Sequence, residues 1–142
     1  MKIKQLSIFV ENKSGRLAQI TKTLAEAGVD IRALSIADTS DFGILRLIVD
    51  RPDDAVEALK DAHLTVSLTE VIAIGIEDKP GEFYKAMEAL SQESIGIEYM
   101  YAFISRDQGR ANVILRVDDN SKAIDVLLRG GFTLLTPDQI AQ

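Results

Sequence analysis

The sequence predicts an α+β protein built from two ferredoxin-like βαββαβ modules, each an antiparallel sheet with its helices on one face. Three observations lead to this fold class. The sequence repeats itself after 66 residues, apolar residues alternate with polar ones as in strands, and apolar stripes with helical spacing lie between the strands.

The internal repeat covers the whole chain. A shift of 66 residues places Gly15 on Gly81 and Leu24 on Leu90, and the surrounding apolar positions coincide as well. After a two-residue insertion in the loop near residues 106–110, the shift becomes 68. Duplication of one ancestral unit followed by divergence explains this register better than chance does.

The elements of the first copy follow from its hydrophobic periodicity. Leu6, Ile8 and Val10 alternate in a strand, and a helix with one apolar stripe follows and ends near Gly28. Two further strands, a second helix and a last strand complete the copy. The expected ranges are residues 31–37 and 43–49 for these strands, a helix that begins at Pro52, and residues 64–68 for the last strand.

The second copy repeats this order. Pro80 is expected at the first position of its first helix, where the missing N–H has no partner to lose. The second helix is expected after residues 118–121. We place the boundary near Leu68–Thr69, which gives modules 1–68 and 69–142, and no Gly/Ser/Pro linker separates them.

Composition restricts the function. The formal net charge of −6 and the absence of a dense basic run disfavour nucleic-acid binding. Cysteine is absent, so disulfides and thiolate chemistry are excluded. No signal segment and no apolar run of membrane-spanning length is present. We therefore expect a cytoplasmic protein that does not bind membranes.

The turn between the first strand and the first helix is the most suggestive local feature. It reads Glu11-Asn12-Lys13-Ser14-Gly15-Arg16-Leu17 in the first copy and Glu77-Asp78-Lys79-Pro80-Gly81-Glu82-Phe83 in the second. A helix N-terminus presents free N–H groups to a carboxylate, and glycine allows a ligand close to the backbone. The alternative is a purely structural role, an ordinary turn in which Asn or Asp only caps the helix.

These residues resemble the opening of an ACT domain, and the likeness extends over both copies. Asn12, Gly15 and Leu17, followed by Gly28-Val29-Asp30-Ile31 after the helix, match the typical pattern, with Asp30 where Asn is more usual. The second copy matches less well, because Ser94 replaces the glycine at the end of the helix.

The resemblance implies a regulatory protein that binds a free amino acid or related small metabolite at an interface between two ACT modules. The implied contacts come from the first loop of one module and the start of the second strand of its neighbour. The implied ligand-binding residues are Asn12, Gly15, Arg16, Leu17 and Ile31 in the first copy and Asp78, Gly81, Glu82, Phe83 and Ile97 in the second.

The two copies are unequal at this loop. Asp78 and Glu82 place negative charge where a ligand carboxylate would approach, whereas Lys13 and Arg16 place positive charge there in the first copy. We therefore expect the first copy to hold the working amino-acid site.

Other candidate residues have structural explanations. His63 is the only histidine and is expected in a surface turn. Tyr99, Tyr101 and Phe103 share one strand face, which favours packing over a ligand pocket. Acidic residues such as Asp53 and Asp119 are expected at helix starts and not at a metal site.

No nucleophile–base pair, phosphate loop or dinucleotide motif occurs, so we expect neither enzymatic activity nor a cofactor. The leading hypothesis is a tandem ACT regulator that acts on another enzyme or regulator and pairs as a homodimer. The alternative is an interaction subunit whose ACT sites are degenerate and whose contacts do not depend on a ligand.

Overall fold

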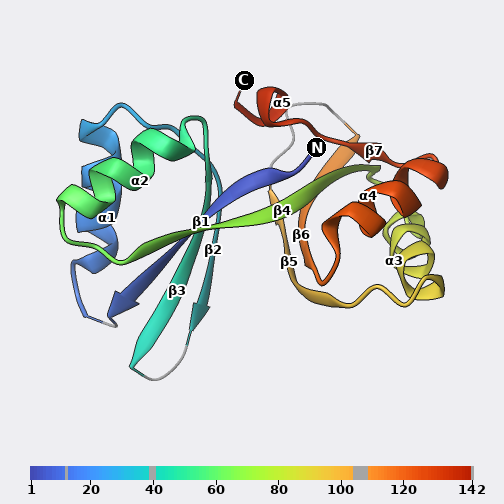
Figure 1. The fold of residues 1–142 in the computed structure, drawn as a ribbon, viewed down its shortest axis with the longest axis horizontal. Helices are drawn as coiled ribbons and strands as arrows, with labels where there is room; N and C mark the ends of the chain where they lie inside the picture. The colour runs from blue at the N-terminus through green and yellow to red at the C-terminus, as the bar shows by residue number, and fades with distance from the viewer. Residues whose placement is uncertain (12, 39–40, 104–108, 142) are drawn as a thin grey trace. The chain divides into compact units, whose positions relative to one another are not determined.

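The computed structural model describes residues 1–11, 13–38, 41–103 and 109–141. Seven strands and five helices occur in this part of the chain (Figure 1). In chain order they are β1 Ile3–Glu11, α1 Arg16–Glu26, β2 Ile31–Asp38, β3 Phe42–Val49, α2 Pro52–Asp61, β4 Val66–Glu77, α3 Glu82–Gln92, β5 Ile97–Phe103, β6 Arg110–Val117, α4 Asn120–Arg129, β7 Thr133–Leu134 and α5 Pro137–Ala141.

The chain divides into two compact units. The first unit comprises Lys4–Thr69 with Ile140–Gln142, and the second comprises Met1–Ile3 with Glu70–Gln139. The strand order is β2-β3-β1-β4 in the first unit and β5-β6-β4-β7 in the second. Because the second unit repeats the order of the first, the predicted pair of ferredoxin-like βαββαβ modules is confirmed.

Strand β4 replaces two predicted strands. The sequence predicts one strand over residues 64–68 and another that includes Ile72 and Ile76, but the structure has a single strand, Val66–Glu77. Residues 69–71 contain neither glycine nor proline, so nothing interrupts the extended backbone. The predicted module boundary between residues 68 and 69 lies within this strand.

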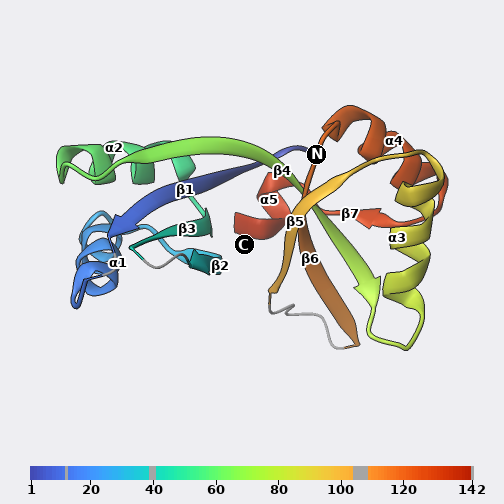
Figure 2. The same ribbon diagram turned by 90° about the horizontal axis from the view of Figure 1, so that it is seen from below.

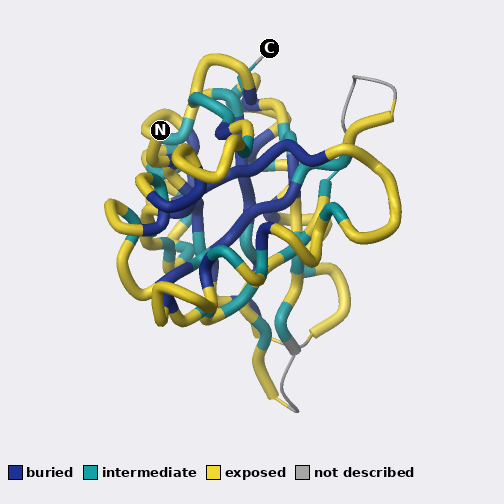
Figure 3. The backbone as a smooth tube through the Cα atoms, turned by 90° about the vertical axis from the view of Figure 1, so that its right-hand side faces the viewer, coloured by how far each residue is buried: buried dark blue, intermediate teal, exposed yellow. Residues whose placement is uncertain are grey.

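Each unit packs two helices on one face of its sheet (Figures 1 and 2). In the first unit, the inward side chains of β1 and β3 contact both helices. The contacts come from the apolar stripe of α1, Ile20 and Leu24, and from the buried residues of α2, Ala55 and Leu59. Equivalent positions of α3 and α4 cover β4 and β6 in the second unit. Buried residues therefore concentrate along the strands, and the connecting loops are exposed (Figure 3).

The sheets are antiparallel, and the same irregularity recurs in both. Leu47 of β3 lies opposite both Leu6 of β1 and Leu34 of β2. A register shift at the start of β2, between Ile31 and Ala33, has its counterpart at the start of β5. The repeat predicted from apolar positions thus extends to backbone detail.

Two short elements complete the chain. Strand β7 has only Thr133–Leu134, which pair with β4. Helix α5, which periodicity did not predict, ends in the residues assigned to the first unit. There the Nη2 of Arg32, at the start of β2, donates a hydrogen bond of 2.6 Å to the backbone oxygen of Ala141.

Left-handed residues end the helices of both units. Gly28 follows α1 with φ 70°, and Ser94 takes the same place after α3 with φ 56°. In both turns the next amide donates to the helix, from Val29 to Leu24 and from Ile95 to Leu90, each at 3.0 Å. A side chain in this backbone region costs energy that glycine avoids.

We expect Ser94→Gly to stabilise the protein by about 0.5–1 kcal/mol, because it removes the left-handed strain at some cost in unfolded-state entropy. Denaturant unfolding measures the change. The matched control is Ser91→Gly inside α3, where the same substitution lowers helix propensity and destabilises by about 0.5 kcal/mol. An unfolding midpoint that falls for both variants would contradict this account.

Candidate functional site

The glycine that ends the turn from the first strand to the first helix has the same backbone conformation in both units. Gly15, directly before α1, has φ 85°, and Gly81, directly before α3, has φ 90°. A Cβ built on either glycine would meet no atom within 4 Å. These glycines are therefore required by the left-handed conformation and not by crowding.

Hydrogen bonds fix the turn that precedes the glycine. In the first unit the amide of Lys13 donates to Glu11 O at 2.8 Å, and the amide of Arg16 donates to Lys13 O at 3.3 Å. The second unit repeats both bonds, from Lys79 to Glu77 at 2.9 Å and from Glu82 to Lys79 at 3.3 Å.

The turn also sets where each helix begins. The prediction that Pro80 is the first residue of α3 is wrong. The left-handed Gly81 is the N-cap, so the helix begins after it and Pro80 lies outside the helix. No side chain of the described residues caps α1 or α3. The amides of Arg16 and Glu82 donate within the turn, and the other first-turn N–H groups, which lack helical partners, are left for solvent or a ligand.

A cavity opens beside this turn in each unit. The first has a volume of about 100 Å³ and lies between the turn, the start of α1 and strands β2 and β3. Its lining residues are Val10, Glu11, Lys13, Arg16, Leu17, Ile36, Gly43 and Leu45.

The second cavity occupies the equivalent place in the second unit and has a volume of about 420 Å³. Its lining residues are Ile76, Glu77, Asp78, Lys79, Phe83, Met100, Tyr101, Ala102, Ala111 and Val113. Seven of these positions correspond to lining positions of the first cavity under the shifts of 66 and 68 residues. The cavity is thus a property of the repeated fold.

The cavities exist because the helices leave one edge strand uncovered on their own side of the sheet. Ile36 lies opposite Leu45 and Leu34 opposite Leu47, so these β2 side chains point to the helix side. Leu34 is nevertheless 59% exposed and Ile36 47% exposed. Met100 of β5 is exposed in the same way in the second unit.

The first cavity carries two basic side chains and one acidic side chain. Lys13 Nζ lies 3.0 Å from Glu11 Oε2, and an Arg16 guanidinium nitrogen lies 3.7 Å from the same oxygen. The hydrogen bond and charge of Lys13, with the charge of Arg16, hold the pKa of Glu11 below its ordinary value. One positive charge remains in excess at this rim.

The second cavity has the opposite balance. Lys79 Nζ lies 3.1 Å from Glu77 Oε2, and Asp78 adds a second carboxylate. The Lys79 hydrogen bond and charge lower the pKa of Glu77. Glu82, which stands where the first unit has Arg16, pairs with Lys85 at 2.9 Å, and this contact raises the pKa of Lys85.

The structure brings together some of the predicted site residues. Arg16, Leu17, Asp78 and Phe83 line the cavities. Gly15 and Gly81 form the turns beside them, and Glu82 is the first residue of α3. Asn12 lies outside the described residues.

The predicted second-strand residues lie elsewhere. Ile31 and Ile97 pack against the core of their own unit and do not line its cavity. Their contact with a ligand bound to a neighbouring module stays a prediction. The sequence prediction did not include the cavity residues of the later strands, Ile36 and Leu45, and their equivalents Ala102 and Val113. Strand alternation places them on the helix side, but only the register shows which pairs face the turn.

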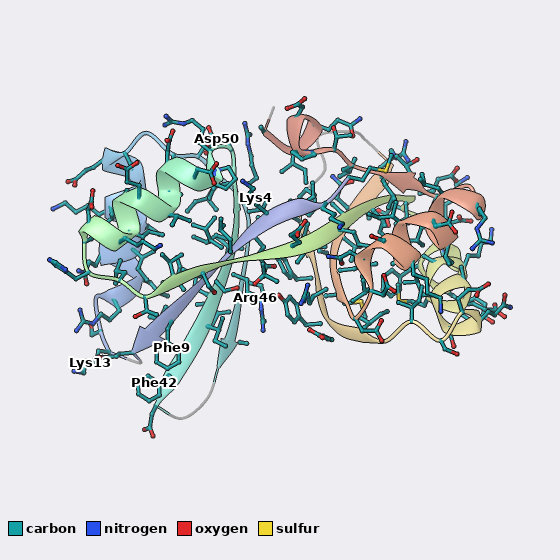
Figure 4. The ribbon with its side chains drawn as sticks, viewed as in Figure 1. Lys4, Phe9, Lys13, Phe42, Arg46 and Asp50 are labelled. Carbon is teal, nitrogen blue, oxygen red and sulfur yellow. The ribbon has the colours of Figure 1, made fainter. Side chains whose placement is uncertain are left out.

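Phe9 and Phe42 stack beside the first turn, with ring centroids 4.8 Å apart. They lie near the tip of the β1–β3 pair, next to Lys13 (Figure 4). Phe9 directly precedes the cavity residue Val10, and Phe42 directly precedes the cavity residue Gly43. Because neighbouring residues of a strand point to opposite faces, the two rings lie on the sheet face opposite to Val10 and Gly43. The ring contact joins the end of β1, which leads into the turn, to the start of β3.

Other candidates have structural roles. His63 is exposed with φ 63° in the turn after α2, as the sequence predicted. Tyr99, Tyr101 and Phe103 are half-buried at alternate positions of β5, and Tyr101 also contributes to the lining of the second cavity. The carboxylate of Asp119 caps α4 by accepting the amide of Lys122 at 3.0 Å.

The comparison with protein families matches all of residues 1–142 to the ACT domain pair. The chain belongs to this family. The resemblance read from the Asn12–Leu17 pattern is confirmed at the level of the family. A comparison with curated proteins found no match.

Solved structures share this arrangement. A crystal structure of a Bacteroides thetaiotaomicron protein is 44% identical, with 100% of this chain and 97% of that chain covered and a TM-score of 0.95. The regulatory subunit of aspartate kinase from Thermus thermophilus is 18% identical, with 89% and 91% covered and a TM-score of 0.65. The same subunit from Thermus flavus is 17% identical, with 98% and 92% covered and a TM-score of 0.64. The last two likenesses concern the fold alone.

Among the described residues, no helix has the length and apolar character needed to cross a membrane.

We expect Lys13→Ala to raise the pKa of Glu11 toward its ordinary value, because the substitution removes the main hydrogen bond and charge that lower it. An NMR titration of the Glu11 carboxyl carbon measures the shift, and Lys79→Ala gives the matched test on Glu77.

The sign of the pH dependence follows from the direction of these shifts. Because the folded-state pKa values are lowered, the ion pairs stabilise the fold above the ordinary pKa of glutamate. The stabilisation is lost as the pH falls through the lowered values. Unchanged Glu11 and Glu77 titrations in the two variants would contradict the assignment.

Proposed function

We propose that this ACT domain pair is a regulatory protein that binds a free amino acid beside the strand-to-helix turn and signals its presence to a partner protein. The observation that carries the proposal is the recurrence of a cavity at the same turn in both units. A cavity retained at equivalent places, next to uncapped helix N–H groups, has the parts needed to hold a small charged ligand.

In the first unit the proposed ligand contact is electrostatic. The carboxylate of an amino acid would meet the first-turn amides of α1 and the excess positive charge of Lys13 and Arg16. Leu17 and Ile36 would contact the apolar part of the ligand. Asn12 is the residue proposed to bind the ligand ammonium, since an amide offers both a donor and an acceptor.

A volume of about 100 Å³ does not enclose an amino acid, since ligand pockets usually span about 300–1,000 Å³. We therefore propose that another ACT module closes the site and contributes the start of its second strand, represented here by Ile31 and Ile97. A homodimer supplies such a module. Ligand binding would then favour the closed arrangement by its differential affinity for the two states.

The proposed partner is an enzyme or regulator of amino-acid metabolism. The regulatory subunits of aspartate kinase that share this fold support a regulatory role for an ACT pair, although the partner of this chain is a separate question. The ligand-independent interaction subunit is the competing function, and the acidic rim of the second cavity favours it there.

We expect at least one free amino acid at millimolar concentration to raise the thermal unfolding temperature of the full chain, by the mass-action effect of ligand on the folded state. Arg16→Gln should weaken this binding about three- to tenfold, because it removes an exposed charge from the first cavity. The matched control is Arg129→Gln on α4, whose side chain pairs with Asp125 outside both cavities.

The competing function predicts the opposite result. No shift with any of the twenty amino acids, together with a partner whose binding is unaffected by them, would establish the ligand-independent subunit and refute the sensor.

A further inference from the structure

The two cavities differ in size and in the residues that face each other across their strands. Ile36 of the first unit faces Leu45, whereas Ala102 of the second unit faces Val113. Both positions thus carry a smaller aliphatic side chain in the second unit, whereas Leu17 and Gly43 correspond there to the larger Phe83 and Ala111. The cavity volume is about 420 Å³ in the second unit against about 100 Å³ in the first.

The walls of the second cavity are mostly apolar. Ile76 and Val113 come from the sheet, Phe83 comes from the first turn of α3, and Met100 comes from β5. Phe83 is 37% exposed and Met100 44% exposed, so both present apolar surface to whatever enters. Filling this space with an apolar group removes that surface from water.

The rim of the second cavity attracts a cation. The Asp78 amide donates to Gly109 O at 2.8 Å, which holds the residue in place where β4 ends and β6 begins. Its carboxylate bonds no described residue, whereas Glu77 is already paired with Lys79. A ligand ammonium beside Asp78 is therefore favoured, and a carboxylate there is not.

We propose that the second cavity is a separate site for amino acids with a large apolar side chain, held mainly through the ammonium by Asp78. This inference rests on the proposed function and extends amino-acid binding to the second unit. There the acidic rim changes the ligand preference of the site and does not abolish binding. The first cavity, small and basic, selects through the carboxylate. The two units therefore respond to different parts of the same class of ligand.

The test uses the full chain and two analogues of phenylalanine. L-phenylalaninamide keeps the ammonium and lacks the carboxylate, whereas N-acetyl-L-phenylalanine keeps the carboxylate and lacks the ammonium. We expect calorimetry at slightly acidic pH to detect binding of the amide and at least about tenfold weaker binding of the N-acetyl compound, since the rim charge opposes a lone carboxylate.

Two substitutions locate the binding. Ala102→Ile restores the residue of the first unit and should weaken phenylalaninamide binding at least about tenfold by filling the cavity. Asp78→Asn restores the residue of the first copy and should weaken it about three- to tenfold by removing an exposed charge. Controls are the same changes outside both cavities, Ala25→Ile on α1 and Asp61→Asn on α2, and thermal unfolding verifies that every variant is folded.

The outcomes separate this inference from the proposed function. Stronger binding of the N-acetyl compound, or phenylalaninamide binding unchanged by Ala102→Ile, overturns the second site. If Arg16→Gln alone weakens the binding of free amino acids, the first site stands and the second falls. If none of these compounds and no amino acid binds, both proposals fail together.

Discussion

A left-handed glycine before the first helix is the constraint on which both candidate sites depend. Gly15 and Gly81 turn the chain from a strand into a helix within a few residues, and this brings an uncapped helix N-terminus next to the open edge of the sheet. Other residues reach this conformation only at a cost of about 1–2 kcal/mol. The left-handed conformation of this residue sets the direction of the chain, and this direction sets the positions of the cavity, its charged rim and the first-turn amides.

The sheet supplies the other half of each site. Two helices cover β1 and β3, or β4 and β6, but they leave the inner face of the edge strand uncovered, which exposes Ile36 in one unit and Ala102 in the other. A change in side-chain volume at that strand alters the cavity, whose inner wall is formed by core residues of the neighbouring strand, Leu45 in the first unit and Val113 in the second. The duplicated fold can thus keep one architecture while its two cavities diverge.

Much of the fold was predictable from local patterns. Alternation identified the strands, the stripe that includes Leu24 identified the first helix, and the repeat carried these assignments to the second copy. The errors occurred where no local signal exists. Nothing in residues 64–76 shows that the strand continues without a break, since extended backbone in one strand and in two adjoining strands has the same alternation. Pro80 suggested a helix start, but the left-handed Gly81 moved the helix beyond it.

The sequence by itself determined the duplication, the two-module fold class, the glycine-containing turn before the first helix of each copy and the inequality of charge between Arg16 and Glu82. Each of these is encoded by residues close together in the chain or in register with the repeat. Only the tertiary structure decided which residues face the turns and how much room they leave. Those properties arise from pairs such as Ile36 with Leu45 and Ala102 with Val113, which the antiparallel register brings together across two strands. A side chain's own sequence neighbours do not reveal its partner on the next strand.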